Sequence, residues 1–406
     1  MTCGAASRRA RPVPELRPGP WLRLIAVGAA AAAALAVVSG ALSLHTAHRA
    51  LAALALPPLA ALVAAAWVAH RRLLAPSVAA LGFFLAAALV TGRPLHIAFA
   101  ALALAATLVA TVATVRGEPV AAAPWGDYVT LTKPRIMSLL LLTGACGMIV
   151  GARGFPSAGL FAETMVGLAL ACGGASALNH VLDRDLDSHM RRTDRRPVAA
   201  ERVAPTRALE FGLALSALSF VLLASLVNVL TAVLALAGNL FYVFVYTRWL
   251  KRSTPQNIVI GGAAGAVPPL VGWAAATGDV TLPALLLFAI VFFWTPPHFW
   301  ALALLIREDY EAAGVPMLPV VRGERETTKQ IALYSGVLVA VTASPFLWGT
   351  LGLPYLVAAL ALGAVFFVLA LGLRSEPTPR RAALLFHFSL LYLALLFAAM
   401  AVDAAL

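Results

Sequence analysis

Long apolar runs separated by short polar loops fill the sequence from Trp21 to its C-terminus. A run of about 20 apolar residues is long enough to cross the hydrocarbon core of a bilayer as a helix. Four such segments are predicted near 22–42, 51–69, 75–91 and 95–114, and nine more near 136–152, 159–178, 207–226, 228–246, 257–276, 282–305, 330–348, 353–373 and 383–402. The pattern therefore predicts an all-α, polytopic membrane protein.

A stretch of changed composition separates the two groups of predicted helices. Residues 116–135 are rich in charge and contain Pro124 and Trp125, so they interrupt the apolar pattern. We expect three parts: a basic cytoplasmic tail over 1–20, a four-helix membrane block over 21–118 and a nine-helix domain over 119–406. The first apolar run, from Leu22, is too long for the core of a signal peptide, so we expect an uncleaved helix.

Basic residues cluster in alternate loops of the nine-helix domain. The loops over 179–206, 247–256, 306–329 and 374–382 carry many Arg and Lys residues, whereas the loops between them carry few charges. Cytoplasmic loops of plasma-membrane proteins have this excess of positive charge. We therefore expect these four loops and the N-terminus to be cytoplasmic, with the C-terminus outside the cell.

The composition narrows the function classes. Of the 406 residues, 61% are hydrophobic and 12% are charged, which excludes a soluble globular domain. The net charge of +12 is explained by the loop pattern, so no nucleic-acid partner is expected. The three cysteines are far apart and odd in number, which favours neither a disulfide framework nor a metal knuckle.

The densest polar run begins at Asn179, where Asn179, Asp183, Asp187 and Arg191 recur at every fourth residue. On a helix, this spacing makes one stripe that drifts by about 40° per step. Carboxylate and amide oxygens suit Mg²⁺, which usually takes one or two carboxylates and leaves its other positions to water and substrate phosphates. The arginines that follow suit an anionic phosphate.

Two further polar clusters belong to loops on the same predicted side of the membrane. One contains Glu308 and Asp309, and the other contains Lys251 and Arg252. Acidic and basic groups around one cavity mouth fit a diphosphate bridged by Mg²⁺. With an allylic diphosphate, departure of the diphosphate would leave an electron-poor fragment that alkylates an acceptor, and no covalent nucleophile would be needed.

The run from Asn179 to Pro197 has the form Asn-x-x-x-Asp-x-x-x-Asp-x-x-Met-x-Arg-Thr-x-x-Arg-Pro, and supporting blocks are Leu131–Arg135, Tyr246–Ile258, Gly261–Pro269, Trp294–Phe299 and Asp309–Pro319. These blocks cover about residues 125–403. The chain resembles the UbiA-type intramembrane prenyltransferases. More narrowly, it resembles the members of that family that farnesylate haem, the protoheme IX farnesyltransferases.

The resemblance implies a nine-helix bundle that transfers a farnesyl group from farnesyl diphosphate to a vinyl group of haem B, giving haem O for terminal oxidase assembly. It implies Mg²⁺ as cofactor, haem B and farnesyl diphosphate as substrates, and haem A synthase or oxidase assembly factors as candidate partners. Catalysis would depend on Asp183, Asp187 and Lys251. The implied metal ligands are Asn179, Asp183, Asp187, Asp309 and Glu308, and the implied diphosphate-binding residues are Lys133, Arg135, Arg191, Lys251 and Arg252. Ala313 stands where the wider superfamily often has a second aspartate four residues after Asp309.

His48 and His96 lie near the starts of the second and fourth predicted helices of the N-terminal block. Two imidazoles at one depth of a four-helix bundle are candidate ligands of a b-type haem. The surrounding residues resemble one half of haem A synthase. The alternative is that these are interfacial histidines in an anchoring bundle.

Other functions remain open on the residues alone. The polar run could be only a solvated helix end with internal ion pairs. A prenyltransferase of the same fold could use an aromatic quinone precursor as acceptor, and a membrane phosphotransferase could also use two aspartates. A transporter or a haem-binding subunit is less favoured, because transporters commonly place polar sites near the bilayer midplane rather than at one rim.

Overall fold

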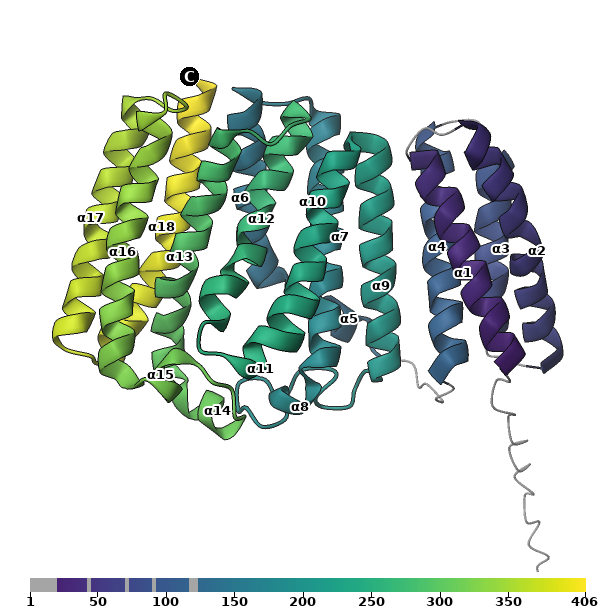
Figure 1. Cartoon of the computed structure of the whole chain (residues 1–406), viewed down its shortest axis with the longest axis horizontal. Coiled ribbons are helices and arrows are strands. Elements are labelled where there is room, and N and C mark those ends of the chain that lie inside the picture. Colours follow the sequence, from purple (N-terminus) through teal and green to yellow (C-terminus); the bar gives the residue numbers. More distant parts are fainter. Residues whose placement is uncertain (1–19, 42–44, 70–72, 90–92, 117–122) are drawn as a thin grey trace, which may run out of the picture.

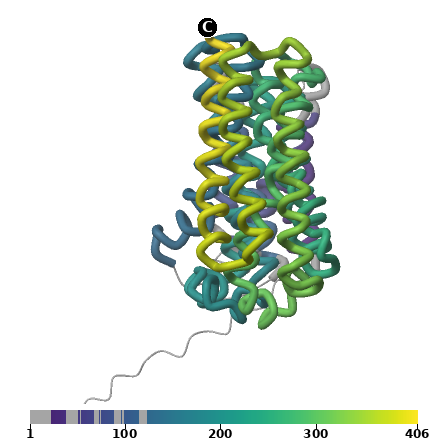
Figure 2. Tube along the Cα trace, turned by 90° about the vertical axis from the view of Figure 1, so that its left-hand side faces the viewer, coloured from purple at the N-terminus to yellow at the C-terminus, as the bar shows by residue number. Residues whose placement is uncertain are grey.

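A computed structural model of the protein describes residues 20–41, 45–69, 73–89, 93–116 and 123–406. Within these ranges the chain is helical, with short turns and no strand. Nine of the described helices are long and apolar enough to cross a membrane. They run side by side in one elongated bundle, as two views at right angles show (Figures 1 and 2). The predicted all-α, multi-pass membrane fold is confirmed.

The nine spans agree with the predicted segments. They are α6 (Pro134–Ala152), α7 (Ala158–Leu182), α9 (Pro205–Leu222) continued by the π-helix η2 (Leu223–Val227), α10 (Val229–Leu240) continued by the π-helix η3 (Phe241–Leu250) and α11 (Lys251–Ser253), α12 (Asn257–Thr277), α13 (Leu282–Leu305), α16 (Gly323–Leu347), α17 (Leu353–Ser375) and α18 (Pro379–Ala405). Helix α16 begins about two turns before its predicted start, because those first turns are polar and carry no apolar signal.

Short helices occupy the loops at one end of the bundle. Helices α8 (Arg184–Asp187), α14 (Arg307–Ala312) and α15 (Leu318–Val321) lie there together with α11, whereas the C-terminus lies at the other end (Figure 1). A further short helix, α5 (Trp125–Leu131), precedes α6. The polar loops that the sequence predicts on one side of the membrane therefore meet at one rim of the bundle.

The N-terminal block consists of α1 (Pro20–Ala41), α2 (His45–Ala69), α3 (Leu74–Leu89) and α4 (Arg93–Arg116), which stand beside α9 (Figure 1). Ala33 and Val37 of α1 and Ala101 and Leu104 of α4 pack against Val221 of α9. The apolar segments described in these four helices are shorter than 18 residues. Whether they span the membrane, and whether the block is a separate domain, stay predictions.

Glycines allow α6 and α12 to approach closely. A Cβ atom on Gly147 would overlap the backbone of Pro269, and a Cβ atom on Gly272 would overlap the backbone of Gly144. Small residues at such crossings are typical of membrane helices, which associate through close packing rather than through the hydrophobic effect. This close crossing packs α6, the first of the nine spans, directly against α12.

We predict that Gly147→Ala destabilises the protein by about 1–3 kcal/mol, because backbone atoms cannot move aside as a flexible side chain can. The matched control is Gly265→Ala in α12, since a Cβ atom there meets nothing within 4 Å. Thermal unfolding of both variants in the same detergent measures the difference. Equal stability of the two variants would contradict the close crossing.

Candidate active site

Three buried polar side chains lie where α7 ends. Asn179 belongs to the last turn of α7, Asp183 is its C-terminal cap and Asp187 is the last residue of α8. Each of the three residues is at most 3% exposed. Polar groups so deeply buried need partners, because an unpaired charge away from water is unfavourable.

The predicted helical stripe does not continue to Arg191. Helix α7 ends at Leu182, and after α8 the chain turns through bonds from His189 N to Leu186 O and from Met190 N to Asp187 O. These three-residue turns replace the four-residue helical repeat, so Asn179 to Arg191 do not share one continuous helix, and α7 ends four residues after its predicted end at 178. Arg191 is exposed in this turn, and its diphosphate role stays a prediction.

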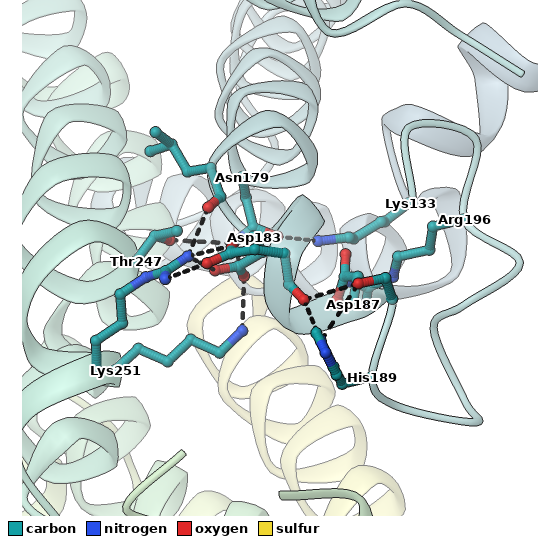
Figure 3. Close-up of polar contacts among 12 residues, drawn as sticks. Lys133, Asn179, Asp183, Asp187, His189, Arg196, Thr247 and Lys251 are labelled. Carbon is teal, nitrogen blue, oxygen red and sulfur yellow. Dashed lines mark hydrogen bonds and ion pairs between the residues drawn. The ribbon is translucent and has the colours of Figure 1, made fainter. Parts of the chain in front are cut away.

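Asp183 forms the centre of the cluster around the end of α7 (Figure 3). Its Oδ2 atom accepts hydrogen bonds from Lys251 Nζ at 2.6 Å and from Asn179 Nδ2 at 2.7 Å. Its Oδ1 atom is enclosed but accepts no hydrogen bond from the described residues; the guanidinium of Arg252 lies 3.9 Å away. One oxygen of this carboxylate therefore keeps its hydrogen-bonding capacity.

Asp187 is paired with Arg196. Nη1 of Arg196 donates to both carboxylate oxygens of Asp187 at 2.8 Å. The hydroxyl of Thr193 also donates to the backbone carbonyl of Asp187 at 3.2 Å. The arginine-rich turn after α8 thus folds back onto the second aspartate.

Lys133 approaches the same cluster from the start of α6. Its backbone has φ 51° and ψ 61°, a left-handed conformation that is uncommon for a residue with a side chain. Its Nζ donates to Asn179 Oδ1 at 2.7 Å. Burial, reinforced by the nearby charge of Arg196, lowers the pKa of Lys133 to about 7, while the aspartates oppose this shift.

The π-helix η3 positions the groups that approach from the opposite side. Asn179 Nδ2 donates to Thr247 Oγ1 at 3.1 Å, and Lys251 follows Thr247 by four residues. π-Helical turns occur frequently at functional sites. Arg252 donates to Asp185 at 2.6 and 2.7 Å, and these hydrogen bonds lower the pKa of Asp185 to about 2.

The second predicted acidic cluster, Glu308 and Asp309, contacts the first cluster around Asp183 and Asp187 only indirectly. Asp309 Oδ2 accepts a hydrogen bond from the backbone N–H of Arg192 at 3.3 Å, so α14 docks onto the turn after α8. Glu308 is exposed, and its carboxylate has no polar partner among the described residues. Within the described ranges, no three His, Cys, Asp or Glu side chains gather closely enough to hold a metal ion by themselves.

The structure gathers six of the predicted site residues: five share one polar network, and Asp187 lies beside it, paired with Arg196. Others lie apart. Lys133, Asn179, Asp183, Lys251 and Arg252 belong to one network, whereas the guanidinium groups of Arg135 and Arg191 are exposed and contact no polar group that the structure describes. The sequence analysis did not select Arg196 or Thr247. Arg196 is nevertheless a fixed position of the motif from Asn179 to Pro197, and Thr247 lies in the block Tyr246–Ile258.

The two candidate haem ligands of the N-terminal block are described unequally. His96 Nδ1 lies 2.6 Å from the carbonyl oxygen of Ala87, which joins α4 to the end of α3. The side chain of His48 lies outside the described part of the chain. The paired haem site therefore stays a prediction.

Fold and site together define a class: an intramembrane helix bundle with an acidic and basic cluster at one rim. Residues 140–397 match the model of the UbiA prenyltransferase family. The chain belongs to the UbiA prenyltransferase family, as the resemblance in its motifs predicted.

Two relatives and one solved structure illustrate the similarity. The protoheme IX farnesyltransferase of Symbiobacterium thermophilum is 56% identical over 279 residues, which is 68% of this chain and 93% of the relative. That of Thermus thermophilus is 54% identical over 283 residues, 70% of this chain, but the chain spans only about half of that relative, 46%. A UbiA homologue from Archaeoglobus fulgidus, bound to DMAPP and Mg²⁺, has the same fold, with 18% identity and a TM-score of 0.54 over 68% of this chain and 99% of the homologue.

We predict that Lys251→Met destabilises the protein by about 3 kcal/mol, because it leaves the buried carboxylate of Asp183 without its closest cation. The comparison is Asp185→Asn, which weakens an ion pair whose aspartate is 57% exposed and should change stability by less than about 1 kcal/mol. Thermal unfolding measures both effects. If adding Asp183→Asn to Lys251→Met restores no stability, the assigned ion pair is contradicted.

Proposed function

We propose that the protein transfers a farnesyl group from farnesyl diphosphate to a vinyl group of haem B in a Mg²⁺-dependent reaction, giving haem O for terminal oxidase assembly. The observation that carries this proposal is the buried cluster at the end of α7, where two aspartates meet three cations. Its support comes from relatives named protoheme IX farnesyltransferase and from a homologue of the same fold that binds an allylic diphosphate with Mg²⁺.

The residues present fit Mg²⁺. Oδ1 of Asp183 is a buried carboxylate oxygen that accepts no hydrogen bond from the described residues, which is a suitable position for a hard cation. Asn179, Asp183 and Asp187 would hold the ion, and Asp309 with Glu308 would serve a second one. Mg²⁺ would supply positive charge to the phosphate oxygens of the departing diphosphate.

The cations of the cluster have a second task in this proposal. In the protein alone, Lys251 neutralises Asp183 and Arg196 neutralises Asp187, while Lys133 binds Asn179. Once the aspartates hold a metal, these cations can donate to the phosphate oxygens that the metal does not bind. The charge that develops on the leaving diphosphate is then stabilised from both sides.

The apolar interior below the rim suits the prenyl chain and the acceptor. The main core is built from α6, α12, α13 and α16–α18, with aromatic side chains including Trp273, Trp294 and Phe366. Such an interior excludes water from an electron-poor allylic carbon until the acceptor is alkylated. Under the positive-inside rule, we place the rim at the cytoplasmic face of the plasma membrane.

We predict that Asp183→Ala and Asp187→Ala each reduce Mg²⁺-dependent turnover by at least about 100-fold, because the metal loses a charged ligand. The assay incubates the membrane-embedded protein with haem B, farnesyl diphosphate and Mg²⁺ and follows the extracted haem by mass spectrometry, with and without chelator. The control is Asp194→Ala, an exposed aspartate of the same turn whose loss should change little.

Each outcome of this assay has a distinct meaning. A chelator-sensitive product heavier by a farnesyl group and a hydroxyl supports donor, acceptor and metal together, the hydroxyl coming from water that adds to the vinyl carbon left electron-poor by alkylation. Prenylation of a quinone precursor in place of haem would preserve the fold assignment but overturn the acceptor. Near-normal turnover by both aspartate variants would overturn the metal assignment.

We also predict that Arg135→Ala and Arg191→Ala raise the KM for farnesyl diphosphate about 10-fold or more while leaving the KM for haem B within about twofold. A charge-assisted hydrogen bond contributes about 1.5–3 kcal/mol, and both guanidinium groups are free to turn toward a bound diphosphate. Steady-state kinetics with each substrate varied in turn measures the two constants. A matching rise in both KM values would argue against diphosphate binding by these arginines.

A further inference from the structure

His298 lies among aromatic side chains on α13 and has no role in the proposed diphosphate site at the end of α7. It follows Pro296 and Pro297 and lies seven residues before the end of α13, about 10 Å below the rim at 1.5 Å per residue. Its ring stacks between Trp294, at a centroid distance of 4.3 Å, and Phe386 of α18, at 5.0 Å. The two aromatic neighbours restrict how the imidazole can rotate.

Ser389 of α18 determines which nitrogen of His298 carries the proton. Ser389 Oγ lies 2.6 Å from His298 Nδ1 and 2.6 Å from the carbonyl oxygen of Phe386. The hydroxyl has one hydrogen, and a carbonyl can only accept, so the hydrogen points to Phe386. His298 Nδ1–H must then donate to Ser389 Oγ. The reverse arrangement would leave two oxygens 2.6 Å apart without a hydrogen between them.

The remaining nitrogen, Nε2, therefore has a free lone pair. It makes no hydrogen bond with the residues that the structure describes, and it is not among the fully enclosed polar atoms. A doubly protonated ring would need an acceptor at Nε2, and none is present within the described ranges. Trp294 Nε1 donates to the backbone carbonyl of Ser389 at 2.8 Å, which keeps α18 and its serine in place.

We propose that Nε2 of His298 binds the iron of the acceptor haem and that Ser389 is the positioning residue that presents this lone pair. A histidine that ligates a metal generally donates its other N–H to an oxygen, which fixes the tautomer and the ring orientation. Imidazole is also a common axial ligand of haem iron. The inference rests on the proposed function, because it takes haem B as the acceptor.

The position of His298 agrees with this role. Helix α13 continues from His298 to its end at Leu305, and α14 then carries Asp309 to the turn after α8. Iron bound at His298 would hold the haem about two helical turns below the rim, where the proposed function places the diphosphate. The histidine would thus position the vinyl group without taking part in bond formation.

The test compares two porphyrins that differ only at the metal. Haem B and metal-free protoporphyrin IX are titrated into the full-length protein in detergent, and affinity and the Soret absorption band are recorded. The wild-type protein should prefer haem B and show the spectrum of a nitrogen axial ligand. His298→Gln should reduce the preference about 10-fold or more and lose that spectrum, with little change in protoporphyrin binding.

Ser389 and a control histidine complete the experiment. Ser389→Ala should reduce the preference for haem B several-fold, whereas Ser389→Thr, which keeps the hydroxyl, should restore it. His387→Gln is the matched control, because His387 is exposed on the same helix and its Nδ1 contacts only the carbonyl of Ala383. If Ser389 had a purely structural role, Ser389→Ala would weaken the binding of haem B and of protoporphyrin IX equally. That result would contradict the proposal.

The outcomes separate this inference from the proposed function. Wild-type protein that farnesylates haem B but shows no nitrogen axial ligand overturns the iron assignment alone. If His298→Gln prefers haem B over protoporphyrin IX as strongly as the wild type does, the iron assignment is likewise overturned. Wild-type protein that binds neither porphyrin and leaves haem B unmodified overturns the acceptor, and this inference with it.

Discussion

The ion pair between Asp183 and Lys251 is the contact on which the arrangement of the site depends. It joins the end of α7 to the end of η3, and the aspartate is 1% exposed. A buried ion pair is seldom the most stabilising choice, since apolar residues of similar volume often serve stability equally well. We therefore explain the ion pair at the rim of the bundle by the ligands that its charges can bind, rather than by a contribution to the stability of the fold.

The same reasoning accounts for the other cations around α7. Arg196 and Lys133 are each directed at an oxygen of the proposed metal site, Arg196 at Asp187 and Lys133 at Asn179. Asp183 and Asp187 are thus each paired with a cation before any substrate arrives. A divalent ion and a diphosphate entering together add both signs of charge, so each protein group can exchange one partner for another without being left unpaired.

Sequence patterns were sufficient for the spans and for part of the site. Apolar runs predict helices reliably in a membrane, because every backbone polar group must be satisfied within its own segment. The spacing of Asn179, Asp183 and Asp187 predicted all three in the cluster, but it could not position Arg191, because spacing alone does not reveal where α7 ends. Thr247 and Ser389 could not be predicted, since their roles come from π-helical register and from packing between distant helices.

The location of the N-terminal block limits what its histidines can do. The block stands beside α9, whereas α13 and α18, which hold His298, lie toward the other side of the bundle (Figure 1). A haem held between His48 and His96 would therefore be a second haem, distinct from the acceptor haem that we propose at His298. Under the proposed function, farnesyl transfer would depend on the nine predicted spans of residues 119–406, and the two haem predictions can be tested independently of each other.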